Sequence, residues 1–558
     1  MKRTERIPAL AAAFALILVF LAGTPVFAGA RGQQQSGGTS ATAGAKPGLM
    51  VGLVSDTFVT DYRNNYLTRY LEEMLGIDID FYFLPVGAET STKIALMVSS
   101  GDLPDVLLTT SLTDEQILDY GTKGAFIAMD KYLDDPAKSP YFHAIPEPDR
   151  SQFRMYAASA DGHVYTLVHW QPESWNLTAH REYINKAWLD KLGLQVPATT
   201  DELRNVLIAF RDRDPNGNGR RDEIGFYGRY AGTYGENTIG AILNAFIFYN
   251  KGALALDSAG RRVIAPFTDP AFRKGLAYLN TLYKDGVLSA ETFTNDTNQF
   301  RATLAANPSV VGFTSAGSVS NWPLADTNPN FLELNMIPPI KGPDGVNYTP
   351  YTGFIPSRVG SITSKARDPD LAWKFLDAHL EHTVSIISRF GQEDVDWTRK
   401  PELTAKETNA YVSLGLYPKI SLIEMTGIWG EPSAQFWHNP GPRYASEEQG
   451  NTRGSYTRPF DPDSRVAILD AYNYQWYVDK HPEHILPLAK FNTEDALRIA
   501  EPKTNINTYI DQSVAEFVTG VRDINNDAHW NAYLRELSNL GLQTWIDAEQ
   551  RTFDRQKR

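Results

Sequence analysis

Oxygen-bearing side chains recur at alternate positions in one loop that two glycines, Gly217 and Gly219, interrupt. Counted from Asp214, the loop offers ligands at positions 1, 3, 5, 7, 9 and 10, namely Asp214, Asn216, Asn218, the main-chain carbonyl of Arg220, Asp222 and Glu223. Calcium binds six to eight such oxygens at about 2.3–2.6 Å, and Gly219 falls where a cation-binding loop turns sharply. The pattern predicts a structural calcium site.

Two alternatives to this interpretation stay open. A loop counted from Asp212 places Gly217 at position 6 and Glu223 at position 12, but it puts Arg220 at a side-chain ligand position. We favour the register from Asp214, because no positively charged side chain then occupies a ligand position. A metal-free, solvated turn is the second alternative, since Asn-Gly-Asn-Gly at 216–219 is by itself a strong turn signal.

Catalytic motifs are absent from the sequence around this loop. A glycosidase needs two carboxylates about 5–9.5 Å apart. Glu393 and Asp396 are close in sequence, but a chain with 66 acidic residues contains many such pairs. The stretch 315–318 does not match the Gly-x-Ser-x-Gly elbow of serine hydrolases, and neither a zinc-protease motif nor a phosphate loop occurs. The sequence therefore favours a protein that is not an enzyme, with a secreted polysaccharide-degrading enzyme as the alternative.

The N-terminal stretch is typical of an export signal. Basic residues between Lys2 and Arg6 precede an apolar run at 9–22, and Val26-Phe27-Ala28 supplies small residues before a cleavage site. We expect a signal peptide at 1–28 and a flexible Gly/Ser-rich tether at 29–48. The sequence has no cysteine, so neither disulfides nor a lipid on an N-terminal cysteine is expected. A periplasmic or secreted protein is predicted.

The composition of the chain argues against one class of ligand and indicates a globular protein. The 558 residues carry a formal net charge of -13, which argues against nucleic acid as a ligand. The chain is long enough for more than one lobe, and its hydrophobic content of 42% is that of a globular protein.

Strand and helix patterns alternate from residue 49 onward. Apolar runs fit strands at 49–54 and 77–84, and the stretch 101–108 is a loop that leads into a further strand, while 63–75 and 92–99 show helical spacing. This order is the βαβ alternation of a parallel sheet covered by helices. The sequence predicts an α/β fold.

Several segments, taken in order, resemble one family. The carrying stretches are 99–106 (SSGDLPDV), 121–130, 161–167, 184–203, 338–345, 390–397 (FGQEDVDW) and 517–520. Together they resemble the family 1 extracellular solute-binding proteins of ABC importers, and in particular the large oligosaccharide-binding subgroup that includes alginate-binding proteins. The resemblance covers about residues 49–549. The chain departs from many Gram-positive members in lacking the lipid-anchor cysteine.

The resemblance implies a periplasmic-binding-protein-like fold of two lobes, each a sheet flanked by helices, with a hinge and a ligand cleft between them. In the implied division, the first lobe consists of 49–164 and 348–384. The second lobe consists of 165–347, which contains the calcium loop at 212–223, and of 385–558. The chain is then expected to cross between lobes near 161–167 and 347–351.

The implied function is capture of an oligosaccharide outside the cytoplasmic membrane and delivery to the membrane subunits of an ABC permease. A monomer with structural calcium is expected. Because a fold does not determine its ligand, a peptide or lipid receptor on the same fold stays an alternative.

Aromatic residues in polar segments are the expected ligand contacts, because Trp and Tyr stack on sugar faces while amides and carboxylates bind the hydroxyls. The residues predicted for this role are Trp170, Gln171, Asn321, Trp322, Glu393, Asp396, Trp397 and Trp429. For any single tryptophan the alternative is core packing, since tryptophan is highly buried on average.

Overall fold

The computed structural model describes residues 46–557 except 57, 88, 233, 318–320, 322–328, 352, 400–419, 423–431, 439, 447–452 and 456–464. The predicted signal peptide, the tether up to residue 45, Trp322 and Trp429 lie outside the described residues. Within the described part, no helix combines the length and the apolarity that crossing a membrane requires.

The first sheet has the strand order β12-β3-β1-β2. Its strands are β12 (Ser361–Ile362), β3 (Val106–Leu108), β1 (Gly48–Val54) and β2 (Asp78–Leu84). β1 pairs in parallel with both β2 and β3, which confirms the predicted βαβ start, and β12 adds an antiparallel edge. Side chains alternate between the two faces: Val106 and Leu108 enter one hydrophobic core and Leu107 enters another.

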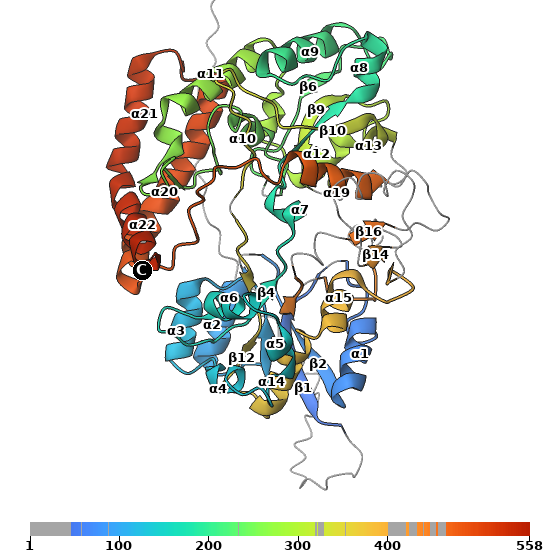
Figure 1. The fold of residues 1–558 in the computed structure, drawn as a ribbon, viewed down its shortest axis with the longest axis vertical. Coiled ribbons are helices and arrows are strands. Elements are labelled where there is room, and N and C mark those ends of the chain that lie inside the picture. The colour runs from blue at the N-terminus through green and yellow to red at the C-terminus, as the bar shows by residue number, and fades with distance from the viewer. Residues whose placement is uncertain are drawn as a thin grey trace, which may run out of the picture. The chain divides into compact units, whose positions relative to one another are not determined.

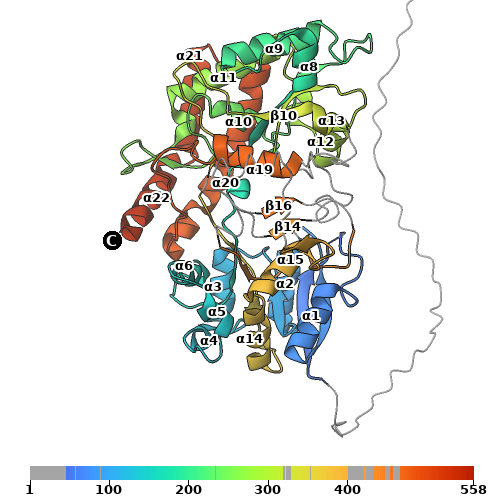
Figure 2. The same cartoon turned by 45° about the vertical axis from the view of Figure 1, so that its right-hand side comes forward.

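Helices cover both faces of this sheet (Figures 1 and 2). They are α1 (Tyr66–Leu75), α2 (Glu89–Ser100), α3 (Asp114–Thr122), α4 (Asp130–Leu133), α5 (Pro140–Ala144), α6 (Asp149–Ala157), α14 (Pro369–Ala378) and α15 (His382–Phe390). α1 begins after the cap Asn65, whose side chain accepts from the Leu67 N–H, and it ends at Gly76 in the left-handed conformation. The larger core also contains Trp397 and Trp437, which follow residue 384 in sequence.

The second sheet has the order β10-β5-β9-β6. Its strands are β10 (Leu334–Ile337), β5 (Arg181–Asn185), β9 (Val311–Ala316) and β6 (Ile224–Phe226). All five residues of β5 are buried, because it lies between two neighbours and helices cover both faces. These helices include α8 (Lys186–Leu192), α9 (Thr200–Asp212), α10 (Thr238–Leu243), α12 (Thr297–Leu304), α13 (Pro329–Glu333) and α19 (Arg465–Trp476).

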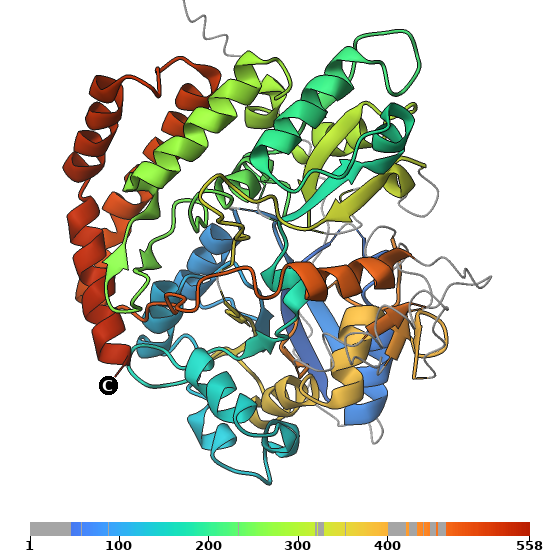
Figure 3. The same ribbon diagram turned by 45° about the horizontal axis from the view of Figure 1, so that its top comes forward.

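A C-terminal group of helices extends the second core. It comprises α20 (Thr493–Thr519), α21 (Asp527–Asn539) and α22 (Leu542–Gln556), which run beside α11 (Pro270–Lys284) in Figure 3. Phe517, Trp530 and Tyr533 fill the interface, and the Asn280 side chain on α11 donates to the carbonyl of Val518 at 3.0 Å.

Three short strands form a separate sheet where the chain passes between the two cores. β4 (Val168–Trp170) pairs antiparallel with β11 (Ser357–Arg358) and parallel with β15 (Arg443–Tyr444). α7 (Ser174–Leu177) follows β4 and leads to β5. Leu167 still packs in the first core, so residues 171–180 make the connection to the second sheet. The remaining short elements are β7 (Ala255–Leu256), β8 (Val263–Ile264), η1 (Pro266–Thr268), η2 (Ala290–Phe293), β13 (Trp397–Thr398), β14 (Ile420–Leu422) and β16 (Arg453–Ser455).

Candidate functional site

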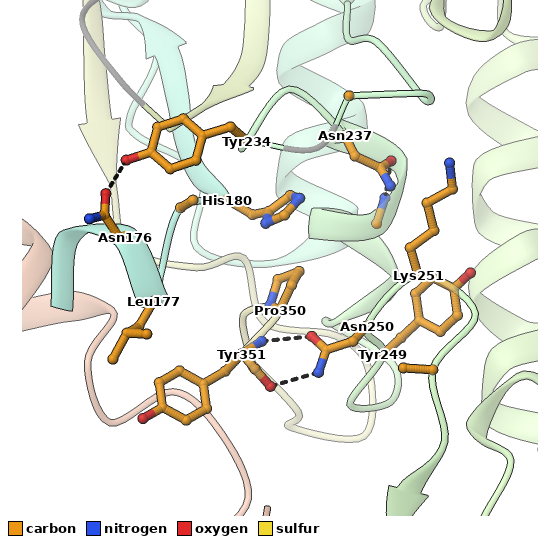
Figure 4. A pocket seen from close by; sticks show the side chains of 14 residues that line it. Asn176, Leu177, His180, Tyr234, Asn237, Tyr249, Asn250, Lys251, Pro350 and Tyr351 are labelled. Carbon is orange, nitrogen blue, oxygen red and sulfur yellow. Dashed lines mark hydrogen bonds between the residues drawn. The ribbon is translucent and has the colours of Figure 1, made fainter. Parts of the chain in front are cut away.

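A cavity of about 350 Å³, here called the second-lobe pocket, lies beside β5 and α10 (Figure 4). Its lining consists of Asn176, Leu177, Ala179, His180, Gly232, Tyr234, Asn237, Gly240, Tyr249, Asn250, Lys251, Ala253, Pro350 and Tyr351. Amides and phenols dominate this set. Such groups donate and accept hydrogen bonds without a net charge, which suits a ligand rich in hydroxyls.

Hydrogen bonds fix the walls of this pocket (Figure 4). The Asn250 amide donates to the main-chain carbonyl of Tyr351 at 2.6 Å and accepts from its N–H at 2.7 Å, so one side chain holds a distant segment. The Tyr351 ring in turn stacks on His481, with ring centroids 4.0 Å apart. On the opposite wall the Tyr234 hydroxyl donates to the Asn176 side chain at 2.5 Å. The lining is therefore largely pre-formed.

Behind the wall that contains Tyr234, the Glu236 side chain accepts hydrogen bonds from neighbouring polar groups. Its carboxylate accepts from the Tyr234 N–H and from the Asn321 amide, each at 3.0 Å. Asn321 also accepts from the Gly317 N–H at 3.1 Å and is only 6% exposed. This predicted ligand residue thus supports the pocket wall and is not among the lining residues. Gly235 is required here, because its φ is +89° and a Cβ would come within 2.1 Å of the Gly317 nitrogen.

The two basic side chains of the pocket lining differ in charge. Burial lowers the pKa of His180 to about 4, with the nearby Arg181 charge acting in the same direction, so the imidazole is neutral at physiological pH. The Lys251 ammonium lies 3.2 Å from the Asp511 carboxylate and 4.5 Å from the centre of the Tyr230 ring. Its charge is therefore already compensated within the protein.

A second cavity, of about 420 Å³ and here called the first-lobe pocket, lies at the carboxyl ends of β1 and β3. It is lined by Val54, Ser55, Asp56, Phe58, Val86, Gly87, Thr90, Leu108, Thr109, Thr110, Ser111, Trp437, His438 and Pro440. The Phe58 and His438 rings stack with centroids 5.4 Å apart, and His438 Nδ1 lies 3.6 Å from Asp56. Parallel α/β sheets bind ligands at this edge.

A buried polar cluster occupies the connection between the cores. The Glu173 carboxylate accepts from the Gln171 amide and from the Asn176 amide at 2.9 Å, and it lies 4.0 Å from Arg389. Arg443 donates to the side-chain amide oxygen of Gln171 at 3.2 Å, and burial lowers the pKa of this arginine, as does the neighbouring Arg389 charge. Gln171, predicted as a ligand contact, is 9% exposed and belongs to this cluster.

Two of the predicted tryptophans, Trp170 and Trp397, lie in the part of the chain that the structure describes, and both are buried. Trp170 is 2% exposed and Trp397 is 0% exposed, and both rings pack in the first core. The Trp397 indole N–H donates to the carbonyl of Gly391 at 2.8 Å. Glu393 pairs with Arg399 at 2.6 Å, and Asp396 accepts from the Gln392 N–H at 2.6 Å. These four residues line neither pocket, so their role as ligand contacts stays a prediction.

Sequence reasoning missed the residues that do line the pockets. Asn250 and Tyr351 are 101 positions apart, and only the folded chain brings them together. Asp56 and Thr109 carry a weak sequence signal, because each lies within two positions of a strand end of the parallel sheet.

The loop at 214–223 adopts a tight, hydrogen-bonded turn after α9. The Asp214 carboxylate accepts from the N–H groups of Gly217, Asn218 and Gly219 at 3.0–3.1 Å. The side-chain amides of Asn216 and Asn218 donate to Asp222 at 3.0–3.1 Å and lower its pKa. The predicted oxygen-bearing side chains therefore converge on one another.

The donor set of this loop fits a hard cation. No described residue hydrogen-bonds the two side-chain oxygens of Glu223, which are buried, and burial raises the pKa of this carboxyl, as do the charges of Asp214 and Asp222. Across the described residues, no three His, Cys, Asp or Glu side chains form a metal-binding group by themselves. The amide oxygens of Asn216 and Asn218 and the Arg220 carbonyl would have to complete the coordination.

The two helix-covered sheets and the strands that connect them define an α/β fold of two lobes. The model of the family "bacterial extracellular solute-binding protein" matches residues 59–382, and the chain belongs to this family.

The sequence similarity to individual relatives extends over most of the chain. It is 25% identical, over 88% of its length and 87% of the relative, to the fructooligosaccharide ABC transporter substrate-binding protein FusA of Streptococcus pneumoniae. It is 22% identical, over 59% of its length and 62% of the relative, to the polygalacturonan/rhamnogalacturonan-binding protein YtcQ of Bacillus subtilis.

Solved structures show the same fold. FusA in complex with kestose has a TM-score of 0.73 at 23% identity, covering 91% of this chain and 99% of that one. The alginate-binding protein AlgQ2 without calcium ion has a TM-score of 0.66 at 21% identity, covering 92% and 98%. Another FusA structure, of an EF-hand mutant, has a TM-score of 0.73 at 23% identity and likewise covers 91% of this chain and 99% of that one. The periplasmic-binding-protein-like fold predicted from the sequence is confirmed.

Proposed function

We propose that this chain is the substrate-binding protein of an ABC transporter, which captures an oligosaccharide outside the cytoplasmic membrane and delivers it to the permease. The similarity to FusA over 88% of the chain is the observation that carries the proposal. We further propose a monomer, exported with cleavage near Ala28 and without a cysteine-linked lipid. Trp322 and Trp429, which lie outside the described residues, stay proposed ligand contacts.

The two pockets supply the chemistry that this function needs. Sugar hydroxyls must exchange water for protein hydrogen bonds, and the amides and phenols of the second-lobe pocket offer both donors and acceptors. The half-buried aromatic side chain of Phe58 in the first-lobe pocket suits an apolar sugar face. We propose that these two pockets are the opposing walls of the ligand cleft.

We propose lobes close to the division expected from the sequence, 49–164 with 348–384 and 165–347 with 385–558, but with one change. The second segment of the first lobe extends beyond residue 384, because Phe390, Trp397 and Trp437 pack in the first core. The strands β4, β11 and β15 would then form the hinge.

We expect ligand binding to close the lobes without chemical turnover, because a ligand that contacts both lobes favours the closed form. Small-angle scattering of the protein with kestose should give a smaller radius of gyration than without it, while chromatography recovers the trisaccharide intact. Accumulation of cleaved sugar would instead favour the polysaccharide-degrading enzyme. If a glycan array detects no bound carbohydrate at all, the proposed function is wrong.

We also propose that calcium binds the loop at 214–223 through the side chains of Asp214, Asn216, Asn218, Asp222 and Glu223 and the carbonyl of Arg220. The FusA structure with a mutated EF-hand supports a related loop in that protein. The bound cation would neutralise the carboxylates that repel one another here and would rigidify the turn between α9 and β6.

Calcium is expected to raise the free energy of unfolding by about 2.7 kcal/mol at a hundredfold excess over its dissociation constant. Thermal melting with calcium and with EDTA measures this shift. Asp222→Ala should abolish the shift. Asp212→Ala should retain it, since Asp212 is a ligand only in the alternative register. Loss of the shift in Asp212→Ala alone would favour that register. If the unmodified protein melts at the same temperature with calcium and with EDTA, the proposed calcium site is wrong.

A further inference from the structure

Relatives of this chain include proteins named for neutral and for acidic sugars, fructooligosaccharide for FusA and polygalacturonan for YtcQ. The two ligand classes make different demands on a binding site. A uronic acid brings one carboxylate per sugar residue, and a carboxylate that leaves water needs a guanidinium or ammonium partner. A neutral sugar needs only uncharged donors and acceptors.

The second-lobe pocket offers no unengaged cation among its described lining residues. His180 is neutral at physiological pH, since its pKa is lowered to about 4 by burial and by the charge of Arg181. Lys251 is held 3.2 Å from Asp511, and its ammonium also donates to the Tyr230 carbonyl at 3.3 Å. A uronate would have to share this ammonium, which is partly exposed, with a carboxylate that already pairs with it.

The first-lobe pocket places a carboxylate where a uronate needs a cation, and the His438 imidazole of its lining lies 3.6 Å from that carboxylate. Its lining contains the carboxylate of Asp56, next to the hydroxyls of Ser55, Thr109, Thr110 and Ser111. The Asp56 oxygen accepts from the Phe58 N–H at 2.8 Å, which holds the carboxylate at the pocket. An acidic sugar placed here would meet a like charge, whereas a sugar hydroxyl would donate to it.

The buried arginines near the connection between the lobes interact with groups inside the protein. Arg181 is 0% exposed and donates to the carbonyls of Trp175 and Thr178 at 2.6 and 3.1 Å. Arg443 is 1% exposed and donates to Gln171 and to the Ser388 carbonyl. Arg389 lies beside the buried Glu173. In addition, the net charge of -13 repels polyanions at long range.

We infer that the ligand of this chain is an uncharged oligosaccharide and that uronic-acid polymers are excluded by the charges lining both pockets. This inference rests on the proposed function and names its substrate class.

The test is calorimetric titration of the purified full chain with two trisaccharides, kestose and trigalacturonate, after a glycan array has ranked neutral and acidic oligosaccharides. We expect the neutral sugars to bind more tightly than any uronate by about tenfold or more, since uronates lack a charged partner. We also expect the affinity for the best neutral sugar to change less than about twofold between about 50 and 500 mM salt, because screening acts on charges.

A charge variant sharpens the experiment. Asp511→Asn releases Lys251 and should raise the affinity for trigalacturonate several-fold, while the affinity for the best neutral sugar stays unchanged, since Asp511 does not line the pocket. Tight binding of trigalacturonate to the unmodified chain, weakened by salt and by Lys251→Met, would overturn the inference and leave the proposed function intact. Absence of binding to every glycan on the array would overturn both.

Discussion

Replacing Trp397 by alanine is expected to reduce the free energy of unfolding by about 3–5 kcal/mol, the usual cost of removing a large aromatic side chain from a core. The ring is 0% exposed and belongs to the first core, and its indole N–H donates to the Gly391 carbonyl at 2.8 Å. The substitution therefore leaves a cavity and also leaves a main-chain carbonyl without its donor. Thermal melting and urea denaturation measure the effect.

A paired measurement of ligand affinity separates this expectation from the sequence-based prediction that Trp397 stacks on a sugar. The matched variant is Tyr351→Ala, because the Tyr351 ring lines the second-lobe pocket and stacks on His481. Tyr351→Ala should weaken oligosaccharide binding by about tenfold or more with little change in melting, as for a ligand-contact aromatic. If Trp397→Ala weakens binding instead and melts like the unmodified protein, the stacking role is supported and the core role is wrong.

The sequence predicted features that depend on local spacing. The parallel strands β1, β2 and β3 could be read from apolar runs, and the cap of α1 from Gly76. The oxygen-bearing side chains of the loop at 214–223 alternate in sequence, and a short turn is enough to bring Asp214 close to its neighbours. In each case the interacting residues lie within a few positions of one another, or the pattern repeats with the period of the element.

The sequence could not predict which aromatic residues face a ligand. In the sequence, Trp170 and Trp397 cannot be told apart from exposed ligand-binding tryptophans. Their burial depends on segments from elsewhere in the chain that pack against them. Phe354, for example, meets the Trp170 ring at a centroid distance of 4.9 Å, although the two are far apart in sequence. The pocket wall made by Asn250 and Tyr351 has the same origin, since its hydrogen bonds join distant segments.

The second large effect concerns Glu182, a carboxyl buried in β5. It is 2% exposed, and burial raises its pKa from 4.5 to about 8, although the Ile340 N–H, which donates to Oε2 at 3.1 Å, opposes the shift. A carboxyl whose folded pKa is raised stabilises the fold fully below its unfolded pKa, about pH 4.5, and this stability is lost as the pH rises through 8. The loss amounts to about 1.4 kcal/mol per pH unit inside that window.

The window between about pH 6.5 and 8 isolates this effect. His180 and His379, whose pKa values burial lowers to about 4, act in the opposite direction only below their unfolded value of 6.5. Asp377, whose pKa burial raises to about 6, acts in the same direction as Glu182 only below that pH. From pH 6.5 to 8 we therefore expect the free energy of unfolding to fall by about 2 kcal/mol through Glu182.

Glu182→Gln should remove this fall, because the glutamine carbonyl can still accept from the Ile340 N–H and has no charge to bury. Urea denaturation at intervals across the window compares the variant with the unmodified chain, and the exposed Glu291→Gln is the control that should keep the original pH dependence. The variant is then more stable than the unmodified chain at pH 8 and nearly equal to it at pH 4, below the unfolded pKa of 4.5. An identical slope in both proteins would mean that Glu182 is already ionised in the fold, with its charge compensated by groups around β5.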